Sequence, residues 1–259
     1  MAKKPSGKTS PLFEYIEQAQ GDRPWGAFLD AGTGVHSAKW VAQLRTERWT
    51  AVTGAPGDAE QVRKATDKKR RPQDKIIQGN WAKADLLKGE LYDTVLADYL
   101  LGAIEGFAPY FQAYLFARFR PLTRGRLYIT GPEPYVPDFQ PASEAGRLVW
   151  QIGRFRDACL LLGGDLPYRE YPSGWVMDQL KRAGFAPRAL EHFDIRYKAS
   201  FVDSQIDLCA PRLDRLEDVY LRQAMTQRGE DLRAKALELI DREGGLAHGR
   251  NYVIVAEPV

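Results

Sequence analysis

One segment carries the strongest structural signal in this sequence: Ala27-Phe28-Leu29-Asp30-Ala31-Gly32-Thr33-Gly34-Val35-His36-Ser37-Ala38-Lys39-Trp40. An apolar run ends in an acid, two glycines follow, and the remaining residues are typical of a helix. This order of residue types predicts a strand, a tight turn and a helix. Glycine lets another group come close to the backbone because it has no Cβ and tolerates positive φ. The helix start then offers unpaired N–H groups and the positive end of a dipole.

The composition is typical of a globular protein. The 259 residues include 44% hydrophobic and 27% charged side chains, so we expect a sizeable core. The net charge of +3 is too small to indicate nucleic-acid binding by itself. The two cysteines, Cys159 and Cys209, lack metal-ligand spacing and indicate a reducing, cytoplasmic compartment. No apolar run is long enough to span a bilayer, so we expect no membrane association.

Strand-like and helical segments alternate through the front part of the chain. Seven strands are expected, at about residues 27–30, 49–53, 75–78, 92–97, 126–130, 188–197 and 251–256. Helices are expected at about residues 12–19, 37–44, 58–67, 100–119, 143–162, 175–183 and 203–242; the fourth is interrupted by Pro109 and the last is broken near Gly229. Residues 131–137 carry three prolines and are expected to continue no regular element. The alternation is what a parallel sheet with right-handed crossovers requires.

These elements predict one domain that follows a flexible basic tail. The tail comprises residues 1–10 and includes Lys3, Lys4 and Lys8. Residues 11–259 form the domain, and helical insertions at about residues 138–170 and 203–245 precede the last two strands. No internal repeat, low-complexity segment or clear linker is visible.

The glycine segment is distinguishable from the dinucleotide-binding fingerprint Gly-x-Gly-x-x-Gly. Gly32 and Gly34 match its first two glycines, but Ser37 occupies the third place, which argues against a nicotinamide or flavin enzyme. The segment instead resembles motif I of the class I S-adenosylmethionine (SAM)-dependent methyltransferases, in which a strand ends in acid-x-Gly-x-Gly. A tight turn without a ligand is the structural alternative.

The resemblance extends from about Leu12 to the C-terminus. It implies a Rossmann-like α/β fold with a seven-stranded, mostly parallel sheet, an antiparallel last strand and helices on both faces. Extra helices would lie between strands five and six and between strands six and seven. The ligand would lie at the carboxyl ends of the first strands, as in other open α/β sheets.

The resemblance also implies roles for particular residues. Asn80 would bond the adenine amine, while Trp81 would offer a neighbouring N–H and an apolar face. Asp98 and Tyr99 would lie where the acceptor meets the methyl group, either to take a proton or to orient the acceptor. The implied cofactor-binding residues are Asp30, Ala31, Gly32, Thr33, Gly34, Gly54, Asn80, Trp81 and Asp98, and the implied catalytic residues are Asp98 and Tyr99.

One position departs from the family pattern. The family usually places an acid at the end of the second strand, where it holds the ribose hydroxyls. Here that strand is followed by Gly54-Ala55-Pro56-Gly57. Either the loop folds back to supply Asp58 or Glu60, or the ribose is held by other residues.

Several of these side chains also have purely structural interpretations. Asp30 and Asp98 can be turn acids, Asn80 an ordinary turn residue and Trp81 a core residue. His36 can cap its helix or face solvent, and it qualifies as catalytic only beside a partner acid. The aromatic residues between 107 and 116 can line a substrate pocket or fill the core.

The expected function is therefore that of a SAM-dependent methyltransferase acting on a small organic molecule, under a lid made from the helical insertions. An acceptor on protein or RNA is the alternative, supported by the basic tail and by the basic loop at residues 68–71, which can equally be a solvated surface. A non-catalytic module with the same fold is a third possibility. No metal site is expected, and the acceptor atom and the oligomeric state stay open.

Overall fold

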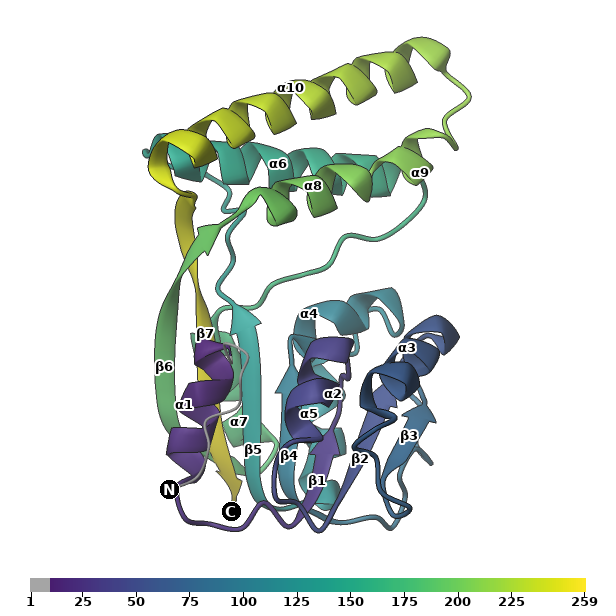
Figure 1. The fold of residues 1–259 in the computed structure, drawn as a ribbon, viewed down its shortest axis with the longest axis vertical. Coiled ribbons are helices and arrows are strands. Elements are labelled where there is room, and N and C mark those ends of the chain that lie inside the picture. The colour runs from purple at the N-terminus through teal and green to yellow at the C-terminus, as the bar shows by residue number, and fades with distance from the viewer. Residues whose placement is uncertain (1–9) are drawn as a thin grey trace. The chain divides into compact units, whose positions relative to one another are not determined.

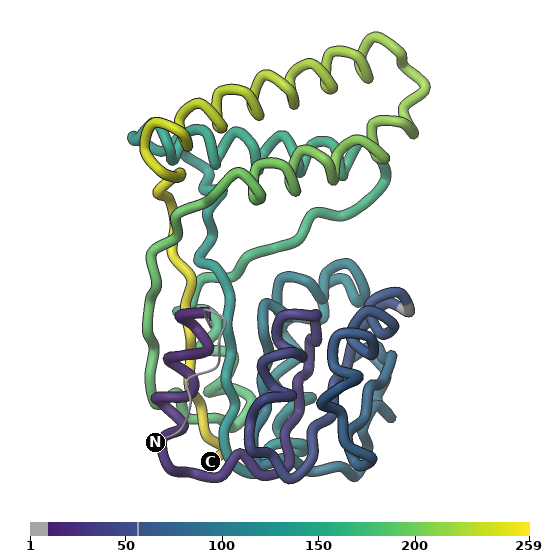
Figure 2. The backbone as a smooth tube through the Cα atoms, viewed as in Figure 1, coloured from purple at the N-terminus to yellow at the C-terminus, as the bar shows by residue number. Residues whose placement is uncertain are grey.

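The computed structural model describes residues 10–259, and the tail predicted for residues 1–10 lies outside this range except for Ser10. The described chain divides into two compact units. The first ends at Gly131 and resumes over Tyr171–Phe193 and Tyr252–Val259, while the second comprises Pro132–Glu170 and Asp194–Asn251. Figure 2 lets the chain be followed through both units. The predicted insertions at residues 138–170 and 203–245 lie within the second unit.

Seven strands form a single sheet in the described part of the chain, in the order β3-β2-β1-β4-β5-β7-β6 (Figure 1). They are β1 (Ala27–Asp30), β2 (Arg48–Thr53), β3 (Lys75–Gln78), β4 (Tyr92–Asp98), β5 (Thr123–Pro132), β6 (Phe185–Tyr197) and β7 (Leu246–Pro258). The pairs β2–β3, β1–β2, β1–β4 and β4–β5 are parallel, and β7 runs in the opposite direction. The predicted seven-stranded, mostly parallel sheet is confirmed.

Helices of the first unit cover both faces of this sheet. They are α1 (Pro11–Gln20), α2 (Val35–Val41), α3 (Pro56–Thr66), α4 (Leu100–Ala103), α5 (Gln112–Phe119) and α7 (Ser173–Arg182). Side chains alternate along a strand, so neighbours on β1 serve different cores. Leu29 packs with residues of α4, α5 and α7, whereas Phe28 packs with residues of α1 and α2. Both cores are therefore anchored on β1.

The register of the parallel strands brings their carboxyl ends to one edge. Asp30, the last residue of β1, lies opposite Ala51 of β2 and Leu96 of β4. The end of β2 pairs in turn with the end of β3, where Thr53 lies opposite Gln78. The loops that follow all four strands consequently meet at this edge, as the sequence pattern predicted.

The helical segment predicted for residues 100–119, interrupted by Pro109, consists of two separate helices. The segment contains α4, a 3₁₀ turn η1 (Ile104–Gly106), a loop and then α5. Pro109 cannot donate a backbone hydrogen bond and disfavours helical backbone before it. The buried carboxylate of Glu105 accepts hydrogen bonds from the Tyr110 N–H (3.3 Å) and from Gln112 Nε2 (2.5 Å). These contacts hold the loop that separates the two helices.

The second unit is a group of helices with a hydrophobic core of its own. Its helices are α6 (Glu144–Leu162), α8 (Ala199–Asp207), α9 (Ala210–Leu213) and α10 (Val219–Glu243). The predicted helix break near Gly229 is wrong, because Gly229 is buried inside α10 and the break falls between α8 and α10. A Cβ on Gly229 would lie 3.0 Å from the Phe155 ring. The glycine thus permits close packing of α10 on α6.

The end of β5 also differs from the expectation. Gly131 and Pro132 were predicted to lie outside regular structure, but they form the last two residues of the strand. Gly131 lies against the hydroxyl of Tyr252 in β7, where a Cβ would approach to 2.6 Å. Proline is tolerated at such a strand end because its missing N–H breaks no central ladder.

The basic loop at residues 68–71 contains one structural arginine. Asp74 is buried and accepts hydrogen bonds from the backbone N–H groups of Trp49 (3.0 Å) and Arg71 (2.8 Å). The guanidinium of Arg71 pairs with the same carboxylate at 2.9 Å and donates to the carbonyl oxygen of Thr46 at 2.6 Å. Arg71 therefore fastens the loop to the start of β2, whereas Lys68 is exposed.

We predict that Asp74→Ala lowers the free energy of unfolding by about 2–4 kcal/mol, because it leaves a buried N–H and a guanidinium without their acceptor. The matched variant Lys68→Ala should change it by no more than about 0.5 kcal/mol. Urea denaturation of the two variants beside the unaltered protein checks this. Equal effects would show that the Asp74 contacts do not hold the loop.

Candidate functional site

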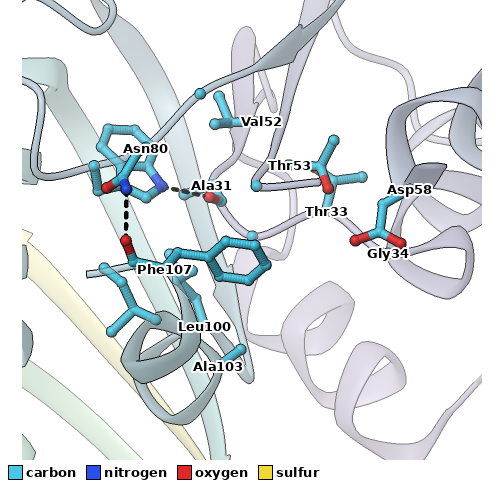
Figure 3. Close-up of a pocket in the computed structure, with 15 residues that line it drawn as sticks. Ala31, Thr33, Gly34, Val52, Thr53, Asp58, Asn80, Leu100, Ala103 and Phe107 are labelled. Atoms are coloured by element: carbon cyan, nitrogen blue, oxygen red, sulfur yellow. Dashed lines mark hydrogen bonds between the residues drawn. The ribbon is translucent and has the colours of Figure 1, made fainter. Parts of the chain in front are cut away.

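A pocket with a volume of about 180 Å³ opens where the loops after β1, β2, β3 and β4 meet (Figure 3). All of its lining belongs to the first unit. The predicted residues that line it are Ala31, Gly32, Thr33, Gly34, Gly54, Asn80 and Trp81. The other predicted residues, Asp30, Asp98 and Tyr99, lie outside the lining. The pocket also includes Asp58, Leu100 and Phe107.

Backbone hydrogen bonds attach the glycine turn to both neighbouring strands. The Ala31 N–H donates to the carbonyl of Leu96 in β4, and the Thr33 N–H donates to the carbonyl of Val52 in β2, each at 2.8 Å. The Thr33 hydroxyl donates to the carbonyl of Asp30 at 2.9 Å. The shape of the turn is therefore determined by the sheet and does not need a ligand.

The two glycines of the turn serve different purposes. A Cβ on Gly32 would lie 2.7 Å from Cβ of Leu100, so Gly32 is needed for packing inside the protein. A Cβ on Gly34 would have no atom within 4 Å, and its φ of −107° suits any residue. Gly34 is exposed and borders the pocket. The close approach that the sequence predicted is thus made by Leu100 at Gly32, while the space beside Gly34 is open.

Asp30 lies beneath this turn and is 1% exposed. Neither carboxylate oxygen has a hydrogen-bond partner among the described residues. Burial raises the pKa of Asp30 to about 7; the nearby Ser37 and Thr33 hydroxyls and the Gly32 N–H oppose this rise, and the charge of Asp98 adds to it. The ionised form of this buried acid is therefore only partly compensated.

The structure distinguishes the two acids that follow β2. Asp58, in the first turn of α3, lines the pocket. Glu60 does not, and its carboxylate lies 3.8 Å from Arg63 and 3.5 Å from Lys64. The helix start brings Asp58 back toward the strand ends. The sequence left Asp58 and Glu60 as alternatives. The path of the chain between Gly54 and α3 decides that Asp58 is the one that lines the pocket.

Asn80 has a fixed orientation because both ends of its side chain are engaged. Its Oδ1 accepts a hydrogen bond from the Ala82 N–H at 2.9 Å, and its Nδ2 donates to the carbonyl of Phe107 at 2.6 Å (Figure 3). Trp81 is more deeply buried, and its Nε1 donates to the Ala31 carbonyl at 2.7 Å. The Trp81 ring packs edge-on against Phe119. The indole therefore supports the glycine turn from within the core.

Asp98 and Tyr99 lie at the end of β4, beside the pocket lining. Asp98 Oδ1 accepts a hydrogen bond from the Thr130 hydroxyl at 2.5 Å. Burial raises the pKa of Asp98, while the Thr130 hydrogen bond and the charge of His36 oppose that rise. Tyr99 is 41% exposed and has a φ of +50°, which is unusual for a bulky residue. Asp98 is therefore the acid near His36, which the sequence alone did not identify.

The aromatic segment after β4 is divided between the pocket and the core. Phe107 lines the pocket and is 43% exposed, whereas Phe116 is buried in the core. No local sequence pattern separates these two residues, because both follow β4 in an apolar stretch. Their positions depend on the helix break at Pro109.

No group of three His, Cys, Asp or Glu side chains among residues 10–259 is arranged to hold a metal ion. No helix in the same range is both long and apolar enough to cross a membrane.

Comparisons with known proteins extend these observations. No family model matches the sequence, and no curated protein matches it significantly. A candidate methyltransferase from Bacillus halodurans C-125 has a similar structure, with a TM-score of 0.59 and 16% identity over 96% of this chain and 99% of the other. A cyclopropane-fatty-acyl-phospholipid synthase-like protein from Lactobacillus casei gives a TM-score of 0.61 and 12% identity, covering 95% of this chain and 89% of the other.

A third similar structure is coclaurine N-methyltransferase bound to N-methylheliamine and SAH, the product that SAM leaves after methyl transfer. Its TM-score is 0.52 at 17% identity, over 95% of this chain and 71% of the other. At identities this low, the structural similarity establishes the architecture alone. The chain has the fold of the class I SAM-dependent methyltransferases.

Proposed function

We propose that this protein is a SAM-dependent methyltransferase whose acceptor is a small organic molecule. The observation that carries the proposal is the single pocket in which the open turn at Gly34, the acid Asp58 and the oriented carboxamide of Asn80 come together. The pocket lies at the carboxyl edge of the sheet, where open α/β folds bind ligands. The fold similarity to coclaurine N-methyltransferase, whose structure contains SAH, supports the same conclusion.

The residues present fit the three parts of SAM. Asp58 would accept hydrogen bonds from the ribose hydroxyls. It would thus replace the acid that the family usually has at the end of the second strand. Asn80 Oδ1 keeps a second lone pair that would accept from the adenine amine. The turn at Gly34 would receive the methionine end, and the unpartnered Asp30 carboxylate lies beneath that turn, where a positive ammonium would lower its electrostatic cost.

When bound, SAM supplies a methyl group that is already activated by its sulfonium. The protein then has mainly to orient the acceptor, an effect that reaches about 7–11 kcal/mol in favourable model reactions. Asp98, with its raised pKa, would take a proton from an acceptor hydroxyl or amine or would position it. Tyr99 would orient the acceptor or form a wall of its site.

Two observations bear on the alternatives. Arg71 of the basic loop is committed to Asp74 and Thr46, which weakens the support for an acceptor on protein or RNA. Cys159 and Cys209 are both free and buried, in keeping with a cytoplasmic location. A non-catalytic module would fold in the same way but bind neither SAM nor SAH, so calorimetric titration with both compounds separates it from the enzyme.

We predict that Gly34→Val abolishes SAH binding while the protein stays folded. The new side chain would enter open space that borders the pocket, and the backbone angle accepts it. The loss should exceed about tenfold in affinity, since the ligand can no longer approach the turn. Calorimetric titration measures the affinity, and the thermal unfolding midpoint reports folding.

The matched control is Gly174→Val, because Gly174 also has no atom within 4 Å of an added Cβ and lies outside the pocket lining. Gly32→Val is a poor substitute, since its side chain would collide with Leu100 and unfold the turn. If the Gly34 variant binds SAH normally, the cofactor does not occupy this pocket.

We also predict that Asp58→Asn weakens SAH binding by about tenfold, because a charge-assisted hydrogen bond to the ribose becomes a neutral one. Glu60→Gln is the matched control, since Glu60 lies two residues later on α3 outside the pocket. Titration calorimetry of both variants should show an effect only for Asp58. Equal affinities would mean that the ribose is held elsewhere.

We predict that Asp30 makes the stability of the protein depend on pH when no ligand is added. Its folded-state pKa of about 7 exceeds the ordinary value of 3.8, so the folded state binds the proton more tightly than the unfolded state. Its contribution to the free energy of unfolding is therefore full below about pH 4, falls as the pH rises to about 7, and is constant above that.

Asp30→Asn removes this titration. Relative to the unaltered protein, the variant should gain stability between pH 4.5 and 8, by up to about 4 kcal/mol if the whole shift is realised. Urea denaturation at several pH values measures the difference between the two proteins. A difference that does not change with pH would show that Asp30 is ionised without penalty.

A further inference from the structure

Thr130 lies at the centre of a short chain of hydrogen bonds near the end of β5. It is fully buried, and it lies opposite Asp98 of β4 in the parallel ladder. Its hydroxyl donates to Asp98 Oδ1 at 2.5 Å, and its Oγ1 accepts a hydrogen bond from the Tyr99 N–H at 3.2 Å. One threonine side chain therefore contacts both residues that the proposed methyl transfer places beside the acceptor.

The direction of each hydrogen bond follows from the groups that make it. A hydroxyl has one proton to donate, whereas a backbone N–H can only donate. The Tyr99 N–H occupies an acceptor position on Thr130 Oγ1, so the hydroxyl proton of Thr130 points to Asp98, and Asp98 Oδ1 accepts it. When Asp98 is protonated, its own proton is consequently carried by Oδ2.

The two carboxylate oxygens of Asp98 thereby have different environments. Oδ1 is engaged by Thr130, whereas Oδ2 accepts no hydrogen bond from the described residues and is not buried. Asp30, the acid at the end of the neighbouring strand β1, has both of its oxygens buried. Of these two acids, Asp98 is therefore the one with an oxygen that another molecule can reach.

Thr130 also supports the unusual backbone conformation of Tyr99. Tyr99 precedes α4 and has a φ of +50° and a ψ of 12°. A bulky residue keeps this left-handed conformation only where its surroundings hold it. The Tyr99 N–H donates to the carbonyl oxygen of Thr130 at 3.2 Å as well as to its hydroxyl. A variant that lacks the hydroxyl would thus keep one of the two bonds.

We propose that Thr130 is a positioning residue for methyl transfer, because its hydroxyl holds Asp98 with Oδ2 presented to the acceptor. The inference rests on the proposed function and names an atom within that site. The acceptor hydroxyl or amine loses its proton to Asp98 Oδ2, while Thr130 stays hydrogen-bonded to Oδ1.

The orientation of Asp98 depends on Thr130 more than on the charges around it. The titratable groups near Asp98 are Asp30 on β1, His36 on α2 and the adjacent Tyr99. None of the three donates a hydrogen bond to the Asp98 carboxylate in the described part of the chain. A charge nearby changes the energy of the carboxylate, but a hydrogen bond also fixes its direction.

The first test measures the pKa of Asp98 by carbon-13 NMR of its carboxyl group in the ligand-free protein. Thr130→Val keeps a side chain of similar shape but removes the hydroxyl. The ionised carboxylate then loses its donor, so the pKa of Asp98 should rise by about one pH unit. Thr130→Ser restores the hydroxyl and should return the pKa to within about 0.3 pH units of the original value.

The matched control is Thr50→Val. Thr50 is also a fully buried threonine in the sheet, on β2, and its hydroxyl has no hydrogen-bond partner among the described residues. This variant should leave the pKa of Asp98 unchanged. A pKa of Asp98 that is the same in Thr130→Val as in the unaltered protein would overturn the proposal, because a threonine that only fills space would give that result.

A second measurement uses the unaltered protein alone, so it stands even if Thr130→Val fails to fold. The proton of a buried hydroxyl that is held by a carboxylate exchanges slowly enough with water to be observed by proton NMR. Its resonance should move as Asp98 titrates. A Thr130 hydroxyl proton that is not observed, or whose resonance does not follow this titration, would contradict the proposed hydrogen bond.

Calorimetric titration with SAH separates a failure of this inference from a failure of the proposed function. Thr130 lies outside the pocket lining, so Thr130→Val should bind SAH within about twofold of the unaltered protein. A loss of more than about tenfold would show that Thr130 supports the pocket and would overturn its assignment to Asp98. Absence of SAH binding in the unaltered protein would instead refute the proposed function, whereas the NMR measurements would still decide whether Thr130 holds Asp98.

Discussion

The site depends on two backbone hydrogen bonds that attach the turn after β1 to its neighbours. Ala31 donates to Leu96 of β4 and Thr33 donates to Val52 of β2, so both neighbouring strands hold the turn that follows Asp30. This attachment explains why the loops after four strands share one pocket. It also means that the strands on both sides of the turn determine its shape.

The same attachment also destabilises the folded protein, because it buries an acid. Asp30 is carried into a buried position beneath the turn, where its carboxylate oxygens find no hydrogen-bond donor among the described residues. An isolated buried carboxyl destabilises the folded protein unless it is protonated or meets a cation. Such uncompensated groups are found where a protein interacts with a ligand, and this one adjoins Asp98 in a site proposed to receive a positively charged molecule.

The glycines around the pocket serve the protein's own packing as much as its ligand. Leu100 rests on Gly32 and Phe107 rests on Gly54, while Gly34 faces open space. A glycine-rich turn is commonly interpreted as a place where a ligand approaches the backbone. Here that interpretation suits Gly34, whereas the other two glycines admit side chains from the segment that follows β4.

The sequence by itself determined the sheet, the turn at Asp30–Gly34 and seven of the fifteen residues that line the pocket, because strand alternation and glycine turns are local signals. Only the tertiary structure decided that Asp58 and not Glu60 borders the pocket, that Phe107 lies on Gly54, and that His36 has Asp98 nearby. Gly229 is a further example, because the reason for a glycine inside α10 is its contact with Phe155 of α6, which is distant in the sequence. Each of these contacts joins residues far apart in the chain, and no local pattern encodes such a pairing.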